Sequence, residues 1–437
     1  NYILHRGDTK DPGPDPTLDR DTYGGDVWQL QVADPEAPYV LPIIRGAASA
    51  GDLSKQRAHW INQSTIVWNI EADPNRDYAL YYAPDGGMVL ASNTISGGLS
   101  IPLFLDPAGL TDEQKAQWPH LANYTVFRLR SQDLPLVPDI LKGQIAVVES
   151  VPGFVSNATG VQIAGVLDDL FTYSGALGVT FNGGVPTVAV WAPTARSVKL
   201  HLWDDITPRA ASADEEFIID MTPGPQGVWT ATGDASWKGM YYLFEVEVYV
   251  PSTGFVERNM VTDPYSLALS TNSQYSMIVD LNDPALAPAG WGTVAKPPLA
   301  APEDIKLYEL HLRDFSISDS SVPEAERGTY MAFTHPDSNG MTHLKTLQQA
   351  GLTHIHLLPV FDIATINENK NERVEPNVPD AAPDSDQQQA AVMATADQDG
   401  FNWGYDPYHY TVPEGSYSTN PEGVTRIIEF RAMVQAL

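Results

Sequence analysis

The fold of the last third of this 437-residue chain is decided by Ile305-Lys-Leu-Tyr-Glu-Leu-His-Leu-Arg-Asp-Phe315 and Thr353-His-Ile-His-Leu-Leu-Pro-Val-Phe361. Both stretches are short and mostly apolar, which is typical of buried strands. Between them, Met341–Ala350 carries apolar residues at helical spacing and is followed by Gly351, which predicts a helix that ends there. A strand, a helix and a second strand in this order predict a βαβ unit with parallel strands and a right-handed crossover.

The rest of this region predicts a long loop and a last helix. The segment Asp362–Phe401 is long and polar, which is typical of a functional loop or of disorder. Asn420 as N-cap and Pro421 at the first helical position predict where the last helix begins. Its predicted apolar face consists of Val424, Ile427, Ile428, Val434 and Leu437.

These elements do not complete an α/β layer. Two buried parallel strands need hydrogen-bonding partners at their outer edges and cover for both faces. We therefore expect further polypeptide to complete the region after Leu437. The alternative is that this region does not fold as written.

Residues 1–290 follow a different pattern. Short apolar, β-branched and aromatic runs alternate with Gly, Pro, Asn and Asp, which predicts an all-β region. Within it, Tyr241–Val250 alternates strictly near its end, so one face should be solvated and the other packed. A Gly-rich stretch and the Pro-rich connector Pro284–Pro302 predict boundaries near residues 170 and 300.

Composition excludes several classes of partner and of chemistry. The chain has 25 Lys and Arg against 55 Asp and Glu, a formal net charge of −30, and its basic residues form no runs. Nucleic acid and anionic membranes are therefore excluded as partners, whereas neutral polymers and cations remain. The chain has no cysteine, which excludes disulfides and thiolate sites. The longest uncharged stretches are interrupted by polar residues, so no membrane span is predicted, and residues 1–30 show no signal-peptide pattern.

Two groups of candidate metal ligands are weak. His354 and His356 share one strand face, which is a metal-ligand geometry in principle. Because no third ligand is near in sequence, hydrogen-bonded histidines are the favoured interpretation. The carboxylates spaced through Gly7–Asp21 lack the spacing of an EF-hand, which favours a solvated loop over a calcium site.

Four tryptophans in the second β region could stack on sugar rings. Trp191 and Trp229 lie within predicted strands, so core packing is the favoured role for both. For Trp203 and Trp237, exposure to a sugar stays open as the less favoured alternative.

The densest group of functional side chains is Phe401-Asn-Trp-Gly-Tyr-Asp-Pro-Tyr-His-Tyr410. It follows the second predicted parallel strand, and in α/β folds the loops at the carboxyl ends of the strands form the site. Aromatic faces with a few fixed polar groups suit a carbohydrate, which offers apolar CH faces and hydroxyl groups. From composition alone, a packed turn cluster is equally favoured.

Three motifs in this order carry a resemblance to a known family: Tyr308-Glu-Leu-His-Leu-Arg-Asp-Phe-Ser316, Gly351-Leu-Thr-His-Ile-His-Leu-Leu-Pro-Val-Phe-Asp362 and Asn402-Trp-Gly-Tyr-Asp-Pro407. They resemble the opening of the catalytic barrel of type I pullulanases and limit dextrinases, which are starch-debranching enzymes of glycoside hydrolase family 13. The last motif is highly specific to that group. Upstream, Val188–Ala195 and Val261–Tyr265 resemble a family 48 carbohydrate-binding β-sandwich.

The resemblance extends over nearly the whole chain. Ala58–Ile61 with Thr65–Trp68 is similar to the preceding β-domain of pullulanases, and Leu4–Asp15 to the end of a family 41 starch-binding module. The implied fold class is multidomain, with all-β sandwich modules followed by the start of a (β/α)8 TIM barrel. The implied domains are a starch-binding-module-like end at 1–32, a pullulanase N-terminal β-domain at 33–170, a family 48-like sandwich at 171–295 and an incomplete barrel at 296–437.

The resemblance also implies an activity and a few site residues. The family hydrolyses α-1,6 linkages of pullulan, amylopectin or limit dextrins with retention, using two carboxyl groups. Those carboxyl groups follow the fourth and fifth barrel strands, so no catalytic residue is assigned in this chain, and residues 1–437 alone are predicted to be inactive. Tyr405 matches a tyrosine that stacks on the sugar, Asp406 matches a residue that hydrogen-bonds it, and Trp403 is a weaker candidate that could instead support the loop.

The implied partners are an α-glucan and the remainder of the barrel, on another chain or segment. No cofactor is required and no metal ligand is assigned, although a structural calcium ion with unknown ligands is compatible with the family. A secreted or cell-surface bacterial location is favoured by the resemblance. Two alternatives stay open: a non-catalytic α-glucan-binding array, and a related isoamylase or branching enzyme, which the motif at 402–407 disfavours.

Overall fold

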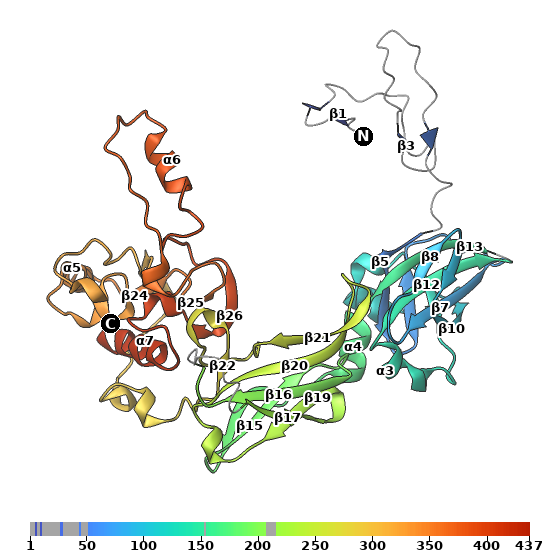
Figure 1. Cartoon of the computed structure of the whole chain (residues 1–437), viewed down its shortest axis with the longest axis horizontal. Coiled ribbons are helices and arrows are strands. Elements are labelled where there is room, and N and C mark those ends of the chain that lie inside the picture. The colour runs from blue at the N-terminus through green and yellow to red at the C-terminus, as the bar shows by residue number, and fades with distance from the viewer. Residues whose placement is uncertain are drawn as a thin grey trace, which may run out of the picture. The chain divides into compact units, whose positions relative to one another are not determined.

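The computed structural model describes residues 51–152, 154–206 and 216–437, together with the backbone of four two-residue strands before residue 51 (Figure 1). These short strands are β1 (His5–Arg6), β2 (Thr9–Lys10), β3 (Val27–Trp28) and β4 (Ile43–Ile44). Apart from the backbone of β1, β2 and β3, the predicted starch-binding-module end at 1–32 lies outside the described residues, and so do the carboxylates of 7–21. The chain divides into two compact units, residues 1–172 with 248–257 and residues 173–247 with 258–437.

The first unit is built on a sheet that closes on itself, in the order β10-β11-β6-β5-β13-β12-β7 (Figure 1, blue to green-blue). Pairing of β10 with β7 closes the ring, and β13 with β5 is its parallel pair. The strands are β5 (Asp52–Asn62), β6 (Thr65–Trp68), β7 (Asp77–Ala83), β10 (Leu99–Leu105), β11 (Thr125–Arg128), β12 (Gln144–Val151) and β13 (Phe154–Gln162).

This closed sheet corrects the prediction of a sandwich for the first β-domain. Alternating strands face one core in either architecture, and here Trp60, Leu80 and Phe127 fill it. Which strands pair depends on residues far apart in sequence, such as the Thr159 hydroxyl that donates to the Lys55 carbonyl at 2.6 Å. The ring is accompanied by the hairpin β8 (Val89–Ala91) and β9 (Thr94–Ser96) and by the helices α2 (Asp112–Gln117), α3 (Val137–Ile140) and α4 (Ala164–Phe171).

The second unit begins with two packed sheets, ordered β14-β15-β19-β18 and β17-β16-β20-β21, with β22 beside β20. Their facing side chains form one core that includes Val188, Leu200 and Phe244, as the alternation of apolar residues predicts. The strands are β14 (Gly178–Asn182), β15 (Val185–Trp191), β16 (Ser197–Trp203), β17 (Glu216–Asp220), β18 (Thr222–Pro223), β19 (Val228–Thr232), β20 (Tyr241–Val250), β21 (Phe255–Val261) and β22 (Ser276–Met277).

The C-terminal part of this unit contains the predicted βαβ arrangement. β23 (Leu307–Leu310) and β24 (His354–Leu357) pair in parallel, with α5 (Asn339–Gln349) between them in sequence. Ser338 caps α5 by accepting from the Met341 amide, and the positive φ of Gly351 follows its end. A separate antiparallel pair joins β25 (Phe361–Ile363) to β26 (Pro407–Pro413).

Both predicted parallel strands are shorter than expected. After Leu310 the backbone turns, and the Phe315 amide donates to the His311 carbonyl at 3.0 Å. Pro359 has no amide proton and ends the second strand, so the predicted stretch 353–361 divides into β24 and the start of β25. The long polar segment contains α6 (Gln387–Met393).

The last helix, α7 (Thr425–Ala436), begins later than predicted. Asn420 does accept from the Glu422 amide at 3.0 Å, but Gly423 has φ +62°, which interrupts a helix that would start at Pro421. The predicted apolar face is also partly wrong: Ile427 is buried, whereas Val434 and Leu437 are exposed. No helix among the described residues is both long and apolar enough to cross a membrane.

Candidate functional site

The 402–407 motif lies in the turn that leads into β26, next to the carboxyl ends of the two parallel strands. Gly404 has φ +78°, and a Cβ at this position would lie 2.8 Å from the Pro359 carbonyl oxygen. Only glycine therefore fits this approach without strain. Since Pro359 follows β24, the turn is fixed directly beyond the end of that strand.

Aromatic and carboxylate side chains of this turn face the solvent. Trp403 is 64% exposed and Tyr405 is 69% exposed, and Asp406 is exposed beside them. The Trp403 ring meets the Phe401 ring edge-on with centroids 6.0 Å apart. The three predicted site residues thus lie together in one turn, with two large apolar faces available to a ligand.

A chain of hydrogen bonds connects this turn to the end of β23. The Tyr417 hydroxyl donates to the Asn402 Oδ1 at 2.9 Å and lies 3.1 Å from the His311 Nε2. His311 directly follows Leu310, the last residue of β23. Burial raises the pKa of Tyr417, so its hydroxyl keeps its proton and holds Asn402 in place.

The other predicted candidates have structural partners. His354 Nδ1 lies 2.9 Å from the Thr353 hydroxyl and His356 Nδ1 lies 3.2 Å from Glu309 Oε2, as the hydrogen-bonded interpretation predicts. Among the described residues, neither histidine belongs to a group of three or more side chains that lie close enough to hold a metal ion.

None of the four tryptophans in the packed sheets is fully exposed. The rings of Trp229 and Trp237 pack against the core between the sheets. Trp191 donates to the Gln226 carbonyl at 3.0 Å, and Trp203 lies edge-on to Tyr275. Core packing therefore holds for Trp229, and extends to Trp237, for which the sequence had left exposure open.

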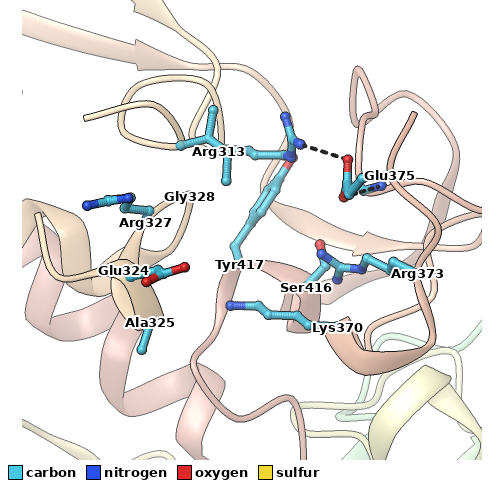
Figure 2. A pocket seen from close by; sticks show the side chains of 12 residues that line it. Arg313, Glu324, Ala325, Arg327, Gly328, Lys370, Arg373, Glu375, Ser416 and Tyr417 are labelled. Carbon is cyan, nitrogen blue, oxygen red and sulfur yellow. Dashed lines mark hydrogen bonds and ion pairs between the residues drawn. The ribbon is translucent and has the colours of Figure 1, made fainter. Parts of the chain in front are cut away.

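A cavity of about 220 Å³ adjoins the turn, and Tyr417 is part of its wall (Figure 2). Its lining includes Arg313 from the turn after β23, Lys370 and Arg373 from the long polar segment, and Ser416. The sequence analysis missed this cavity. The signal that could have indicated it is the grouping of scarce basic residues in the segments that follow the two parallel strands.

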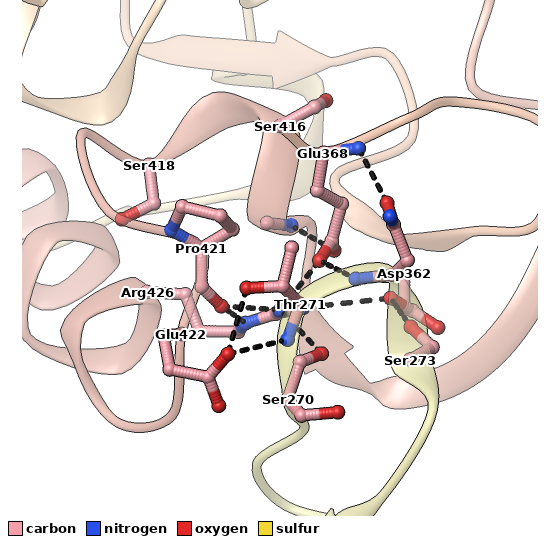
Figure 3. A network of polar contacts seen from close by, with 12 residues as sticks. Ser270, Thr271, Ser273, Asp362, Glu368, Ser416, Ser418, Pro421, Glu422 and Arg426 are labelled. Atoms are coloured by element: carbon pink, nitrogen blue, oxygen red, sulfur yellow. Dashed lines mark hydrogen bonds and ion pairs between the residues drawn. The ribbon is translucent and has the colours of Figure 1, made fainter. Parts of the chain in front are cut away.

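A buried network of charges connects α7 with β25 and the long polar segment (Figure 3). Arg426 from α7 donates to Glu368 Oε2 at 2.9 Å and lies 3.5 Å from Asp362 Oδ1. Asp362 also contacts His409 Nδ1 at 2.7 Å and accepts from the Ser273 hydroxyl at 2.6 Å. The side chains of Asp362, Glu368 and Arg426 are at most 2% exposed. The loss of any ion-pair partner would therefore leave an uncompensated charge in the interior.

Three carboxyl groups share this site with one arginine. Glu414 accepts from the amides of Ile363 at 2.6 Å and Ser416 at 2.7 Å. Burial, followed by the charge of Glu368, raises the pKa of Glu414 to about 8, and burial also raises the pKa of Glu368. Glu414 is therefore largely protonated at neutral pH.

The same carboxyl groups are the donors that a hard cation would use. Ligand atoms of Asp362, Glu368 and Glu414 lie within 4.8 Å of one another. However, Arg426 already occupies the site and pairs with two of them, and burial favours the neutral form of Glu414. The arrangement is that of a buried ion-pair network, which the sequence analysis missed because Glu368 and Asp362 are 58 and 64 residues from Arg426.

Comparison with known proteins assigns both β modules. The model of the pullulanase N2 domain matches residues 55–169, and the model of carbohydrate-binding module 48, the isoamylase N-terminal domain, matches residues 176–266. The chain is 39% identical to pullulanase 1, chloroplastic, of Arabidopsis thaliana, over 87% of the chain and 39% of that protein. It is 36% identical to a pullulanase of Klebsiella pneumoniae, over 87% of the chain and 38% of that protein.

Solved structures agree with the sequence matches. A crystal structure of apo pullulanase from Klebsiella pneumoniae superposes with a TM-score of 0.79 at 35% identity, covering 88% of this chain and 45% of that one. A maltotriose complex of the protein from the same organism gives a TM-score of 0.80. The chain spans about two fifths of the length of the curated relatives it matches. In sequence and fold, the chain matches the N-terminal portion of type I pullulanases.

Proposed function

We propose that the intact protein is a starch-debranching glycoside hydrolase that cleaves α-1,6 linkages in pullulan, amylopectin or limit dextrins. The pullulanase relatives support this proposal, and a relative from Klebsiella pneumoniae was solved with maltotriose. The structural observation in this chain that supports the proposed activity is the turn at 402–407, which presents exposed aromatic rings beyond the ends of two parallel strands. An extreme charge of −30 is no obstacle, because a neutral glucan is neither attracted nor repelled by it.

The C-terminal region is proposed to be the first part of a (β/α)8 barrel. β23 and β24 pair in parallel with α5 between them, which is the repeating unit of such a barrel. The edges of this pair are unpaired within the described residues, as expected of strands that have further neighbours in the intact protein. The proposed domains are those expected from the sequence: 1–32, 33–170, 171–295 and 296–437.

Three residues are proposed to bind the glucan. The Tyr405 ring would stack on a pyranose face, the Asp406 carboxylate would accept hydrogen bonds from its hydroxyls, and Trp403 would extend the apolar platform. Their exposure and shared turn support these roles. The barrel contributes no catalytic carboxyl group in this chain, so the two-carboxyl retaining mechanism depends on residues outside it.

Binding and catalysis can be tested on the intact protein by following the reducing ends released from pullulan. The variants Tyr405→Ala and Asp406→Asn should lower kcat/KM at least about tenfold, as expected when a well-formed sugar contact is lost. Tyr410→Ala is the matched control, because Tyr410 is 72% exposed but lies outside the motif. Equal kcat/KM in all three variants and the parent would contradict the proposed role of Tyr405 and Asp406 in glucan binding.

A further inference from the structure

The cavity beside Tyr417 has a charge opposite to that of the chain (Figure 2). Although the chain has only 25 basic residues against 55 acidic ones, the cavity is lined by four basic and two acidic side chains. The basic side chains are Arg313, Arg327, Lys370 and Arg373, and the acidic ones are Glu324 and Glu375. Clustering of this kind produces a local field that attracts anions despite the overall charge.

Part of this positive charge is already paired. Arg313 lies 3.1 Å from Asp314 and 3.6 Å from Glu375, and its side chain is 16% exposed. Arg327 uses its Nε to donate to the Val322 carbonyl at 3.0 Å. Arg313 therefore mainly stabilises the cavity wall, while the terminal nitrogens of Arg327 have no hydrogen-bond or ion-pair partner among the described residues.

Lys370 and Arg373 retain donors for a ligand. Arg373 donates from Nε to the Asn367 carbonyl at 2.6 Å and from Nη2 to the Glu368 carbonyl at 3.5 Å, which leaves Nη1 without a partner in the part of the chain that the structure describes. Lys370 makes no hydrogen bond or ion pair to a described residue. Burial, followed by the charge of Arg373, lowers the pKa of Lys370 to about 8. The Lys370 ammonium group lies beside the Arg373 guanidinium without a partner among the described residues, and an anion between the two would relieve their repulsion.

Ser416 provides an independent indication. The residue is 5% exposed and lines the cavity, and its hydroxyl oxygen is buried with no hydrogen-bond partner among the described residues. Buried hydroxyls are normally paired. A hydroxyl without a partner, beside the Lys370 ammonium and the remaining Nη1 of Arg373, therefore indicates that a ligand oxygen completes the site.

We propose that this cavity binds a phosphate-type oxyanion, either free or as a monoester on a sugar. The Lys370 ammonium, the Arg373 guanidinium and the Ser416 hydroxyl donate to its oxygens, and Arg327 adds positive charge. Lys370 and Arg373 come from one segment, and Ser416 and Arg327 from two others, which suits a tetrahedral anion better than a planar carboxylate, for which one guanidinium fork is sufficient. The proposal does not depend on the glucan site, although both share Tyr417.

Isothermal titration of the intact protein at low ionic strength tests the proposal. Sodium phosphate and glucose 6-phosphate are the two probes, and glucose is the uncharged control. We expect saturable binding of at least one phosphate probe, weakened at least about tenfold in Lys370→Met and several-fold in Ser416→Ala. Lys345→Met is the matched control: it removes the same charge from an exposed position on α5 and should leave the affinity unchanged.

Thermal unfolding without phosphate adds a second readout. Lys370→Met removes a positive charge that the neighbouring Arg373 repels, so its unfolding temperature should equal or exceed that of the parent even as phosphate binding is lost. Tighter binding of glucose 6-phosphate identifies the ester as the ligand class, and tighter binding of phosphate identifies the free ion. Absence of saturable binding by the parent, or an equal effect of Lys370→Met and Lys345→Met, overturns the proposal.

Discussion

The closed sheet of the first unit and the α/β region at 305–437 stabilise themselves in different ways. The closed sheet has no open edge in its ring, and apolar side chains such as Trp60 and Leu80 fill its centre. The α/β region instead has two separate two-stranded sheets and buries Arg426 with three carboxyl groups. An apolar core follows from local alternation, whereas a compensated charge network requires partners from distant segments.

Removing the central cation should have the largest effect. Arg426→Met leaves Asp362 and Glu368 buried without their partner, and we expect the second unit to lose about 3–5 kcal/mol of unfolding free energy. Chemical denaturation measures this loss. Arg258→Met is the control, because Arg258 pairs with Glu247 at the surface, and a surface pair contributes at most about 1 kcal/mol. Equal losses in both variants would contradict the distinction between the two regions.

An apolar truncation should weaken the first unit. Leu80 is fully buried in the closed sheet, so Leu80→Ala removes contacts and leaves a cavity, with an expected loss of about 2–5 kcal/mol. Denaturant titrations at pH 5 and pH 8 should give the same loss, because no ionisable group contributes to it. A loss that changes between these two pH values would show that charges also stabilise this core.

Stability of the second unit should depend on pH through Glu414. Its raised pKa of about 8 means that the folded state holds a proton that the unfolded state releases near its ordinary pKa of 4.5. This contribution is complete below that pH and is lost as pH rises toward 8. The unfolding midpoint should therefore fall over this range, and Glu414→Gln should flatten the slope. The exposed change Glu303→Gln should retain the parent slope.

A smaller effect is expected at the turn that carries the exposed side chains of Trp403 and Tyr405. Gly404→Ala imposes a Cβ on a backbone with φ +78° and places it 2.8 Å from the Pro359 carbonyl, which should cost at least about 1–2 kcal/mol. Gly183→Ala shares the positive φ but meets nothing within 4 Å, so a difference in denaturation between the two isolates the contact with Pro359. A loss of glucan affinity only in Gly404→Ala would link this contact to the site.

The sequence allowed the local elements to be predicted better than their connections. Alternating apolar residues indicated Tyr241–Val250, and helical spacing with a following Gly351 indicated α5 within two residues of its ends. Local capping rules misplaced the start of α7, because the positive φ of Gly423 is set by its surroundings. The closure of the first sheet was also missed, since it depends on the pairing of β7 with β10.

The candidate site was predicted in part for the same reason. Trp403, Tyr405 and Asp406 are adjacent in sequence, so a motif was enough to group them. Their support by Tyr417 and His311 joins residues 15 and 106 positions apart. The charge network around Arg426 was hidden because one arginine within an apolar helical pattern resembles a surface residue until its partners are known.

The most direct test of the central claim is hydrolysis of pullulan compared with unbranched amylose by the intact protein and by residues 1–437 alone. The account predicts reducing ends from pullulan and none from amylose with the intact protein, and none from either polymer with residues 1–437. Failure of the intact protein to hydrolyse pullulan, or hydrolysis by residues 1–437 alone, would contradict it.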